Sequence, residues 1–272
     1  MRFIIGIIAS LTTGAASATS ETPWIDHDGM LKTRLVTASQ DYATGEGSLL
    51  AWEAKLAPGW KTYWRSPGEA GLPVRVFVAG NEVAPMYPFP ERFDLFGIQT
   101  FGYGNQLLLP FRMPTQPSEL SEIQVDFMVC KEICVPFEQS YQLPDVGAAP
   151  GMSLHDIRFD AWLKKVPEKT GGDGAGLEVI TASVTGRLGH QKLIVDVRAD
   201  TDLSKMDMLA EVNDMFHFGM PQIRLLENGR KARLVLSAMT GNMPEDLRGN
   251  SVRLTFSNGR GAVIERTVQL AK

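Results

Sequence analysis

Cys130 and Cys134 are the two cysteines of this 272-residue chain, and only Lys-Glu-Ile separates them. Upstream, residues 125–130 alternate in character with a period of two, which is typical of a β-strand. The set of alternate side chains that begins at Val125 is apolar throughout and should face the core. Cys130 would then share the wetter face with Asp126. The chemistry open to such a pair is a reversible dithiol/disulfide.

The three residues between the cysteines are about the length of a hairpin loop. Cys134 would then begin the returning strand roughly opposite Cys130. Cross-strand Cβ atoms lie about 4.5–5.5 Å apart, and modest local adjustment reaches disulfide geometry. Pro136 cannot donate a hydrogen bond to a ladder, which indicates an edge strand or a bulge.

A bridge between these cysteines has three possible uses. It would close a loop of only five residues, so chain entropy gives it roughly 2 kcal/mol as a structural staple. A redox pair on an exposed hairpin is the alternative that the spacing favours, and metal binding by the two thiols is the third. The spacing alone leaves all three open.

The N-terminus indicates export. Arg2 precedes a short apolar run over residues 3–11, and Ala16-Ser17-Ala18 matches the small-x-small pattern of a signal-peptide cleavage site. We expect cleavage after Ala18 and an exported chain in the periplasm, where disulfides persist. The net charge of −4 argues against nucleic acid as a partner.

Strand patterns dominate the first half of the chain. Alternation predicts strands over residues 31–39, 48–56, 74–79, 106–112, 123–129 and 135–143. Residues 58–73 are interpreted as an aromatic and basic stretch followed by a turn cluster. Residues 86–101, rich in proline and aromatic side chains, are interpreted as an ordered surface loop or a lid.

A helix and a linker separate this half from the next. Residues 153–166 predict a helix that begins at Ser153 and stops before Pro167. Its apolar face is expected to contain Leu154, Ile157, Ala161 and Trp162. Residues 170–176 are glycine-rich and predict a flexible linker.

The second half again predicts strands, over 177–185, 192–199, 208–212, 222–226, 232–238, 251–256 and 262–270. Asn228-Gly229 and Asn258-Gly259 are strong hairpin turns. The predicted fold is mostly β, with two immunoglobulin-like β-sandwich domains joined by a short helix and a Gly-rich linker. The expected divisions are a signal peptide (1–18), the first sandwich (19–150), helix and linker (151–176) and the second sandwich (177–272).

Other chemistry is weakly indicated. The histidines His27, His155, His190 and His217 lie far apart and form no metal-type pair, and no nucleotide-binding or hydrolase motif is present. Met128 precedes Cys130 by two residues, and Met215, His217 and Met220 cluster. Such soft side chains suit Cu(I), although methionine more commonly fills cores. We predict no metal site and no cofactor.

Three blocks carry a family resemblance. They are residues 59–73 (Gly-Trp-Lys-Thr-Tyr-Trp-Arg-Ser-Pro-Gly-Glu-Ala-Gly-Leu-Pro), Phe101-Gly102-Tyr103, and residues 129–136 (Val-Cys-Lys-Glu-Ile-Cys-Val-Pro). In this order and spacing they resemble the N-terminal periplasmic domain of DsbD, the thiol:disulfide interchange reductase. The similarity is closer to the ScsB-like relatives linked to suppression of copper sensitivity. It covers roughly residues 30–145, and over 177–272 it depends on the second β domain of ScsB-like proteins.

The resemblance implies an immunoglobulin-like sandwich with a solvent-facing redox pair under an aromatic cap loop. Cys130 and Cys134 match the family's redox pair. Phe96 and Phe101 are the cap candidates, with Phe101 preferred and Tyr103 beside it. The supporting residues would be Tyr63, Trp64, Glu69, Lys131 and Glu132.

The implied activity is thiol–disulfide exchange. The pair would receive electrons from a membrane-embedded thiol electron transporter and pass them to periplasmic thioredoxin-fold proteins. Family analogy favours Cys134 as the exchanging sulfur. The sequence shows neither the membrane domain nor the thioredoxin-like domain of DsbD, so both would be separate proteins or the role would differ. Two other functions stay open: a copper-binding protein using Cys130, Cys134 and Met128, and a double-sandwich binding protein with a structural disulfide.

Overall fold

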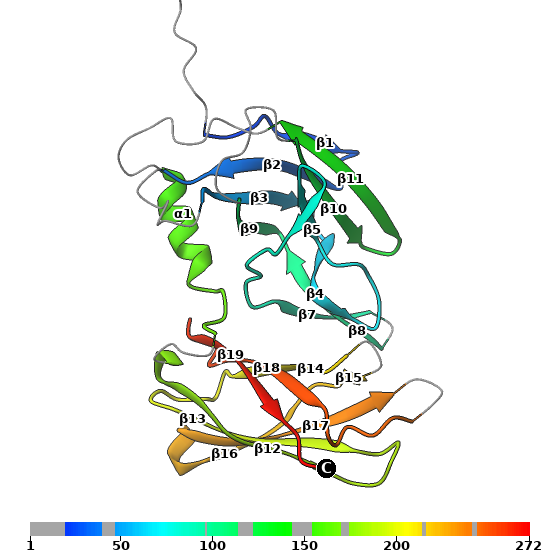
Figure 1. The fold of residues 1–272 in the computed structure, drawn as a ribbon, viewed down its shortest axis with the longest axis vertical. Coiled ribbons are helices and arrows are strands. Elements are labelled where there is room, and N and C mark those ends of the chain that lie inside the picture. The colour runs from blue at the N-terminus through cyan, green and yellow to red at the C-terminus, as the bar shows by residue number, and fades with distance from the viewer. Residues whose placement is uncertain are drawn as a thin grey trace, which may run out of the picture.

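The computed structural model describes residues 20–39, 47–95, 97–113, 122–142, 154–169, 174–213, 216–240 and 244–272. Strands make up most of this part of the chain (Figure 1). Residues 20–142, here called the N-terminal unit, and residues 174–272, the C-terminal unit, are stacked along the long axis of the molecule. Helix α1 (Leu154–Leu163) lies along the side of the N-terminal unit, and the chain then descends to the C-terminal unit.

The N-terminal unit is built from two antiparallel sheets that pack around one core. One sheet has the order β1-β2-β3-β9, and the other has the order β6-β5-β10-β4-β8-β7 with β11 paired to β10. The strands are β1 (Ile25–His27), β2 (Leu31–Thr37), β3 (Leu49–Leu56), β4 (Lys61–Gly68), β5 (Arg75–Val78), β6 (Asn81–Val83), β7 (Glu91–Leu95), β8 (Ile98–Gly104), β9 (Gln106–Arg112), β10 (Glu122–Cys130) and β11 (Cys134–Gln142).

The C-terminal unit repeats this two-sheet plan. Its sheets have the orders β12-β13-β17-β15, with β16 also on β17, and β14-β18-β19. The strands are β12 (Leu177–Thr185), β13 (Lys192–Ala199), β14 (Asp207–Glu211), β15 (Phe216–Phe218), β16 (Gln222–Leu226), β17 (Lys231–Thr240), β18 (Ser251–Ser257) and β19 (Val263–Gln269). Each unit has its own apolar core, so the prediction of a mostly β chain with two sandwiches is confirmed.

Two segments differ from the prediction. Residues 61–68, interpreted as an aromatic stretch before a turn, form strand β4 in the middle of the larger sheet. The expected loop or lid over 86–101 is largely the antiparallel hairpin of β7 and β8. In β4 four consecutive residues from Lys61 to Trp64 are buried, because both faces of this central strand are covered, and the alternation that marks a half-exposed strand is therefore absent.

Helix α1 is present, but only part of its predicted face is packed: Trp162 packs against the core clusters of the N-terminal unit, whereas two other members of that face are exposed. Leu154 is 80% exposed and Ile157 is 57% exposed. Phe159 is buried against the small cluster that includes Val36 and Leu108. Asp156 is buried beside it, and its carboxylate accepts a hydrogen bond from the Ser39 backbone N–H at 2.9 Å. Because the polar residue Asp156 is buried on the packed side of the helix, apolar periodicity alone does not identify that side.

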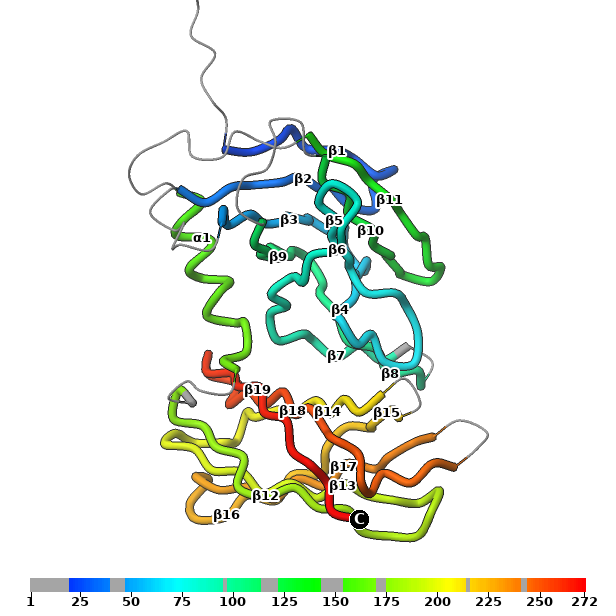
Figure 2. Tube along the Cα trace, viewed as in Figure 1, coloured from blue at the N-terminus to red at the C-terminus, as the bar shows by residue number. Residues whose placement is uncertain are grey.

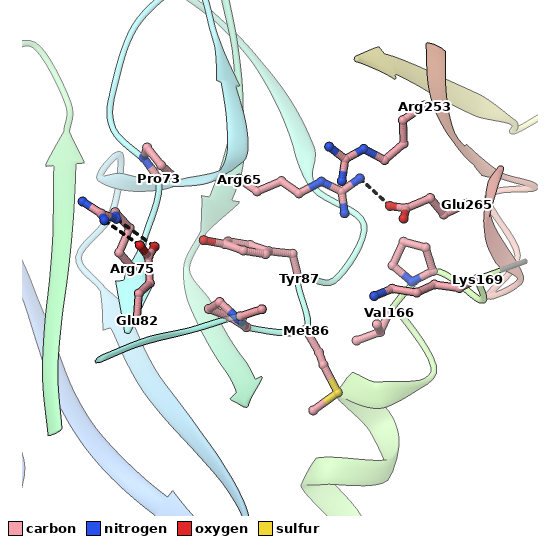
Figure 3. Close-up of a pocket in the computed structure, with 13 residues that line it drawn as sticks. Arg65, Pro73, Arg75, Glu82, Met86, Tyr87, Val166, Lys169, Arg253 and Glu265 are labelled. Atoms are coloured by element: carbon pink, nitrogen blue, oxygen red, sulfur yellow. Dashed lines mark hydrogen bonds and ion pairs between the residues drawn. The ribbon is translucent and has the colours of Figure 1, made fainter. Parts of the chain in front are cut away.

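The two units are in direct contact. Arg65 of β4 pairs with Glu211 of β14, at 2.6 Å, and with Glu265 of β19, at 2.5 Å. Leu209 of β14 belongs to the core cluster of the N-terminal unit and is 3% exposed. A pocket of about 430 Å³ lies at this junction, with Arg65, Tyr87 and Lys169 among its lining (Figure 3).

The predicted boundary between linker and second sandwich remains a proposal. Residues 170–173 lie outside the described part of the chain. Gly174–Gly176 forms a short 3₁₀ turn directly before β12. Before the gap, Glu168 already forms a parallel bridge with Ile264 of β19.

Candidate redox site

Cys130 and Cys134 form a disulfide that joins the end of β10 to the start of β11. The two residues are direct partners in the ladder, with a Cα–Cα distance of 4.1 Å. The Lys131 backbone N–H donates to the Ile133 carbonyl at 3.1 Å and closes the turn. The predicted hairpin and bridge are therefore present. Among the described strands β11 pairs only with β10, so Pro136 lies on an edge strand, as predicted.

The two cysteine residues differ in exposure. Cys134 is exposed, but Cys130 is only 2% exposed, so the expectation of a wet environment for Cys130 was wrong. Cys130 does lie on the face opposite Val125, which is in the core as predicted. It is buried because β4 pairs with β10 at this level and places Lys61 directly beside it. Cys134 is therefore the more accessible of the two cysteines to attack by an incoming thiolate.

Tyr63 of β4 reaches the disulfide. Its hydroxyl lies 3.8 Å from Cys134 Sγ, within hydrogen-bonding range of sulfur. Burial raises the pKa of Tyr63 above its ordinary value, so the phenol stays protonated and can donate. Gly71 covers the ring: a Cβ there would lie 2.3 Å from it, and the φ of +103° also favours glycine. The loop before β5 therefore holds Tyr63 against the bridge.

Lys61 is a site residue that the sequence reasoning did not single out, although it lies in the first resemblance block. It pairs with Cys130 in the ladder, so both side chains share one face of the sheet, here called the redox face. Lys61 is 7% exposed, and its Nζ donates to Thr100 Oγ1 at 2.5 Å. The ammonium lies 5.7 Å from the Tyr63 ring centroid and 5.0 Å from that of Phe93. Burial lowers the pKa of Lys61.

We expect Lys61→Met to lower the reactivity of the reduced cysteines without lowering the stability of the fold. A nearby cation favours thiolate over thiol, so alkylation of the reduced protein at pH 7 should slow by about threefold. Replacing a buried cation by an apolar side chain of similar length should leave stability equal or higher. The matched control is Lys55→Met, because the Lys55 ammonium also stacks on a ring, that of Trp24 at 4.6 Å, but on another sheet.

The same variant has a pH signature. Because the pKa of Lys61 is lower in the folded than in the unfolded chain, the unfolded chain binds more protons between the two values. The cost of burying the cation is therefore present at low pH and disappears as the pH rises towards 10.5, the ordinary lysine value. In urea unfolding, any stability advantage of Lys61→Met should shrink between pH 7 and pH 10. A constant or growing difference would contradict this placement of the charge.

Two of the proposed cap residues, Phe101 and Tyr103, do not share the face of the sheet that carries the bridge. Tyr103 pairs with Thr62, and Phe101 pairs with Arg92, so both aromatic side chains belong to the face opposite the redox face. Tyr103 is buried, with its hydroxyl donating to the Pro88 carbonyl at 2.7 Å. Phe101 packs edge-on against Trp64, 6.5 Å between ring centroids. Phe96 lies outside the described residues.

Phe93 of β7 is the aromatic residue that this hairpin presents to the redox face. It pairs with Thr100 and lies beside the Lys61 ammonium. A Cβ on Gly104 would be 3.6 Å from the Phe93 ring, an ordinary contact. The aromatic character of the segment gave the signal for Phe93, but the face of each ring depends on hairpin register.

The remaining predicted supporting residues are divided between core and surface. Trp64 is fully buried, and the Arg65 guanidinium lies 4.5 Å from its ring centroid. Glu69 Oε1 accepts from the Gln99 N–H at 2.9 Å and ties the loop after β4 to β8. Lys131 and Glu132 are exposed at the hairpin turn, and the Lys131 stem packs over Gly59.

The other candidate ligands in the described part of the chain are spread over both units. No group of three or more His, Cys, Asp or Glu side chains there is arranged to hold an ion. His27 is hydrogen-bonded to Thr33 Oγ1 at 2.7 Å in the core, and His155 pairs with Glu21. Met128 lies on the redox face opposite Pro136, whereas Met220 is exposed on the C-terminal unit. Met215 lies outside the described residues.

Comparison with known families agrees with this geometry. Residues 32–145 match the family model described as thiol:disulfide interchange protein DsbD, N-terminal, a range that contains the disulfide, Tyr63 and Lys61. The N-terminal unit is a DsbD-type N-terminal domain. Residues 165–272 match a domain of unknown function, DUF8393. A search of curated proteins found no match.

The fold also matches a solved structure. The N-terminal periplasmic domain of ScsB from Proteus mirabilis superimposes with a TM-score of 0.74 at 21% sequence identity. The match covers 93% of this chain and 99% of the other, so it includes both units. The DsbD-type domain belongs to a thiol–disulfide interchange family. In this chain it contains the disulfide-bonded pair Cys130 and Cys134. No helix of the described residues is long and apolar enough to cross a membrane.

Proposed function

We propose that this chain is a periplasmic electron relay that passes reducing equivalents through the Cys130–Cys134 pair. The observation that carries the proposal is the asymmetric bridge, with one exposed and one buried cysteine residue on an edge hairpin of a DsbD-type domain. Its electron donor would be a membrane-embedded thiol transporter, and its acceptors would be thioredoxin-fold proteins. An N-terminal signal peptide ending at Ala18 is part of the proposal.

The reduction half-reaction begins at Cys134. A donor thiolate attacks Cys134 Sγ, the Cys130–Cys134 bond breaks, and its electron pair leaves on Cys130 as a thiolate. The donor's second thiolate then attacks the donor sulfur of the mixed disulfide and expels Cys134 as a thiolate. The donor is oxidised to a disulfide, and the pair gains two electrons.

The oxidation half-reaction uses the same sulfur in the opposite sense. The Cys134 thiolate attacks the disulfide of a thioredoxin-fold acceptor and forms a second mixed disulfide. Cys130, held opposite in the ladder, attacks Cys134 Sγ, restores the bridge and releases the acceptor as a dithiol. Tyr63 can donate a hydrogen bond to Cys134 whenever Cys134 is a thiolate. The Lys61 cation favours the thiolate form of the buried Cys130.

A redox titration tests whether the bridge is functional or structural. We expect complete and reversible reduction in the folded protein, because the ladder between β10 and β11 runs from Glu122 to Cys130 and most of it lies away from the bridge. The five-residue loop means that reduction should lower the unfolding free energy by no more than roughly 2 kcal/mol. The measurement is the reduced fraction in dithiothreitol buffers, with circular dichroism following the fold. A bridge that resists excess reductant, or whose loss unfolds the chain, would show a structural staple.

A further inference from the structure

The hairpin formed by β7 and β8 lies on the side of the N-terminal unit that faces the C-terminal unit (Figures 1 and 2). One of its faces carries Phe93 and Thr100, which contact the Lys61 ammonium on the redox face. Because side chains alternate along a strand, Arg92 and Phe101 point the other way. That second face is the one that meets β14 of the C-terminal unit.

Arg92 makes the contact across this boundary. Its Nε donates to Asp207 Oδ2 at 2.7 Å, and its Nη2 donates to Asp207 Oδ1 at 2.9 Å and to the Met208 carbonyl at 2.7 Å. The arginine side chain is 13% exposed and the aspartate side chain 28%. A two-pronged, largely buried pair of this kind fixes geometry far better than an exposed ion pair.

Arg92 also orders the hairpin from within. Its Nη1 donates to Gln99 Oε1 at 2.9 Å, and its guanidinium lies 5.0 Å from the Phe101 ring centroid. The backbone N–H of Gln99 in turn donates a hydrogen bond to the Glu69 carboxylate. Glu69 lies in the same loop as Gly71, which packs on the Tyr63 ring. Asp207 is thus linked through a continuous series of contacts to the tyrosine that touches Cys134.

We propose that the C-terminal unit acts as a brace for the redox site: Asp207 and the Met208 carbonyl hold Arg92, and Arg92 holds the β7–β8 hairpin against Lys61. Leu209 contributes the apolar part of this brace, since it is buried in the core of the DsbD-type domain. This inference rests on the proposed exchange function for its purpose. It gives a role to a unit whose own family has none assigned.

The brace is tested by removing either half of the charge pair. In Asp207→Asn and in Arg92→Met, amide hydrogen exchange across residues 91–104 should accelerate, and alkylation of the reduced cysteines should rise about fivefold or more. The double variant should exceed neither single variant by more than about twofold, because both remove one interaction. Arg92→Lys, which keeps the charge but loses the two-pronged contact, should give an intermediate rate.

A matched pair in the C-terminal unit provides the control. Asp196 also holds an arginine with two contacts, to Arg233 at 2.7 and 2.8 Å, but away from the boundary. Asp196→Asn should leave both rates unchanged. Rates within twofold of wild type in both Asp207→Asn and Arg92→Met, or an equal rise in Asp196→Asn, would overturn the proposal. Neither readout needs a partner protein, so failure of the relay itself would not be mistaken for failure of the brace.

Discussion

Replacing Gly102 with alanine should separate β8 from β4 and open the redox site. A Cβ at Gly102 would lie 1.9 Å from the Thr62 carbonyl oxygen and 3.1 Å from Tyr63 Cα. Both are backbone atoms of the adjacent strand, so no side-chain rotation relieves the clash. We expect the unfolding free energy to fall by about 2–4 kcal/mol. Alkylation of the reduced cysteines should accelerate by about tenfold or more, because opening of the paired strands exposes Cys130, which is buried in the intact sheet.

Gly104, two residues along the same strand, provides the control. A Cβ there would meet only the Phe93 ring at 3.6 Å and a Glu91 oxygen at 3.9 Å, which are ordinary contacts. Gly104→Ala should therefore stay within about 1 kcal/mol of wild type. Urea unfolding and alkylation kinetics measure both variants. Equal effects at the two glycines would contradict the pairing of β4 with β8 that places Lys61 and Tyr63 beside the disulfide.

The cysteine hairpin could be predicted because its signals are local. Alternation upstream of Cys130, a three-residue turn and Pro136 on the returning strand together specify the ladder that the structure shows. The burial of Cys130 could not be read in the same way. It depends on the pairing of Cys130 with Lys61, 69 positions earlier in the sequence. The sequence around Cys130 does not indicate that Lys61 is its neighbour in the sheet.

The aromatic residues of strands β7 and β8 show a related limit. In the β7–β8 hairpin Phe93 pairs with Thr100, and Arg92 pairs with Phe101. Two odd-numbered aromatic residues therefore point to opposite faces, since the turn between them reverses the relation of number to face. Aromatic composition drew attention to this segment, in which the Phe93 ring centroid lies 5.0 Å from the Lys61 ammonium. It could not tell that Phe93, rather than Phe101, faces Lys61.

The exchange mechanism makes an asymmetric prediction for the two cysteines. Cys134 is exposed and meets the partner, whereas Cys130 is buried and completes each half-reaction. Cys130→Ser leaves the exposed thiol without its resolving partner, so a mixed disulfide with a thioredoxin-fold protein should accumulate. Cys134→Ser leaves only the buried thiol, and trapping should be at least about tenfold slower. Both variants should lose net exchange entirely and keep their fold.

The most direct measurement of the central claim is this trapping reaction. Purified Cys130→Ser and Cys134→Ser proteins are each mixed with a thioredoxin-fold protein in its disulfide form, and the covalent complex is followed by non-reducing electrophoresis and mass spectrometry. A relay predicts a rapid complex through Cys134, a slow one through Cys130, and reversal of both by dithiothreitol. No complex with either variant, while each stays folded, would contradict the account and leave the Cys130–Cys134 bridge as a structural feature of the hairpin.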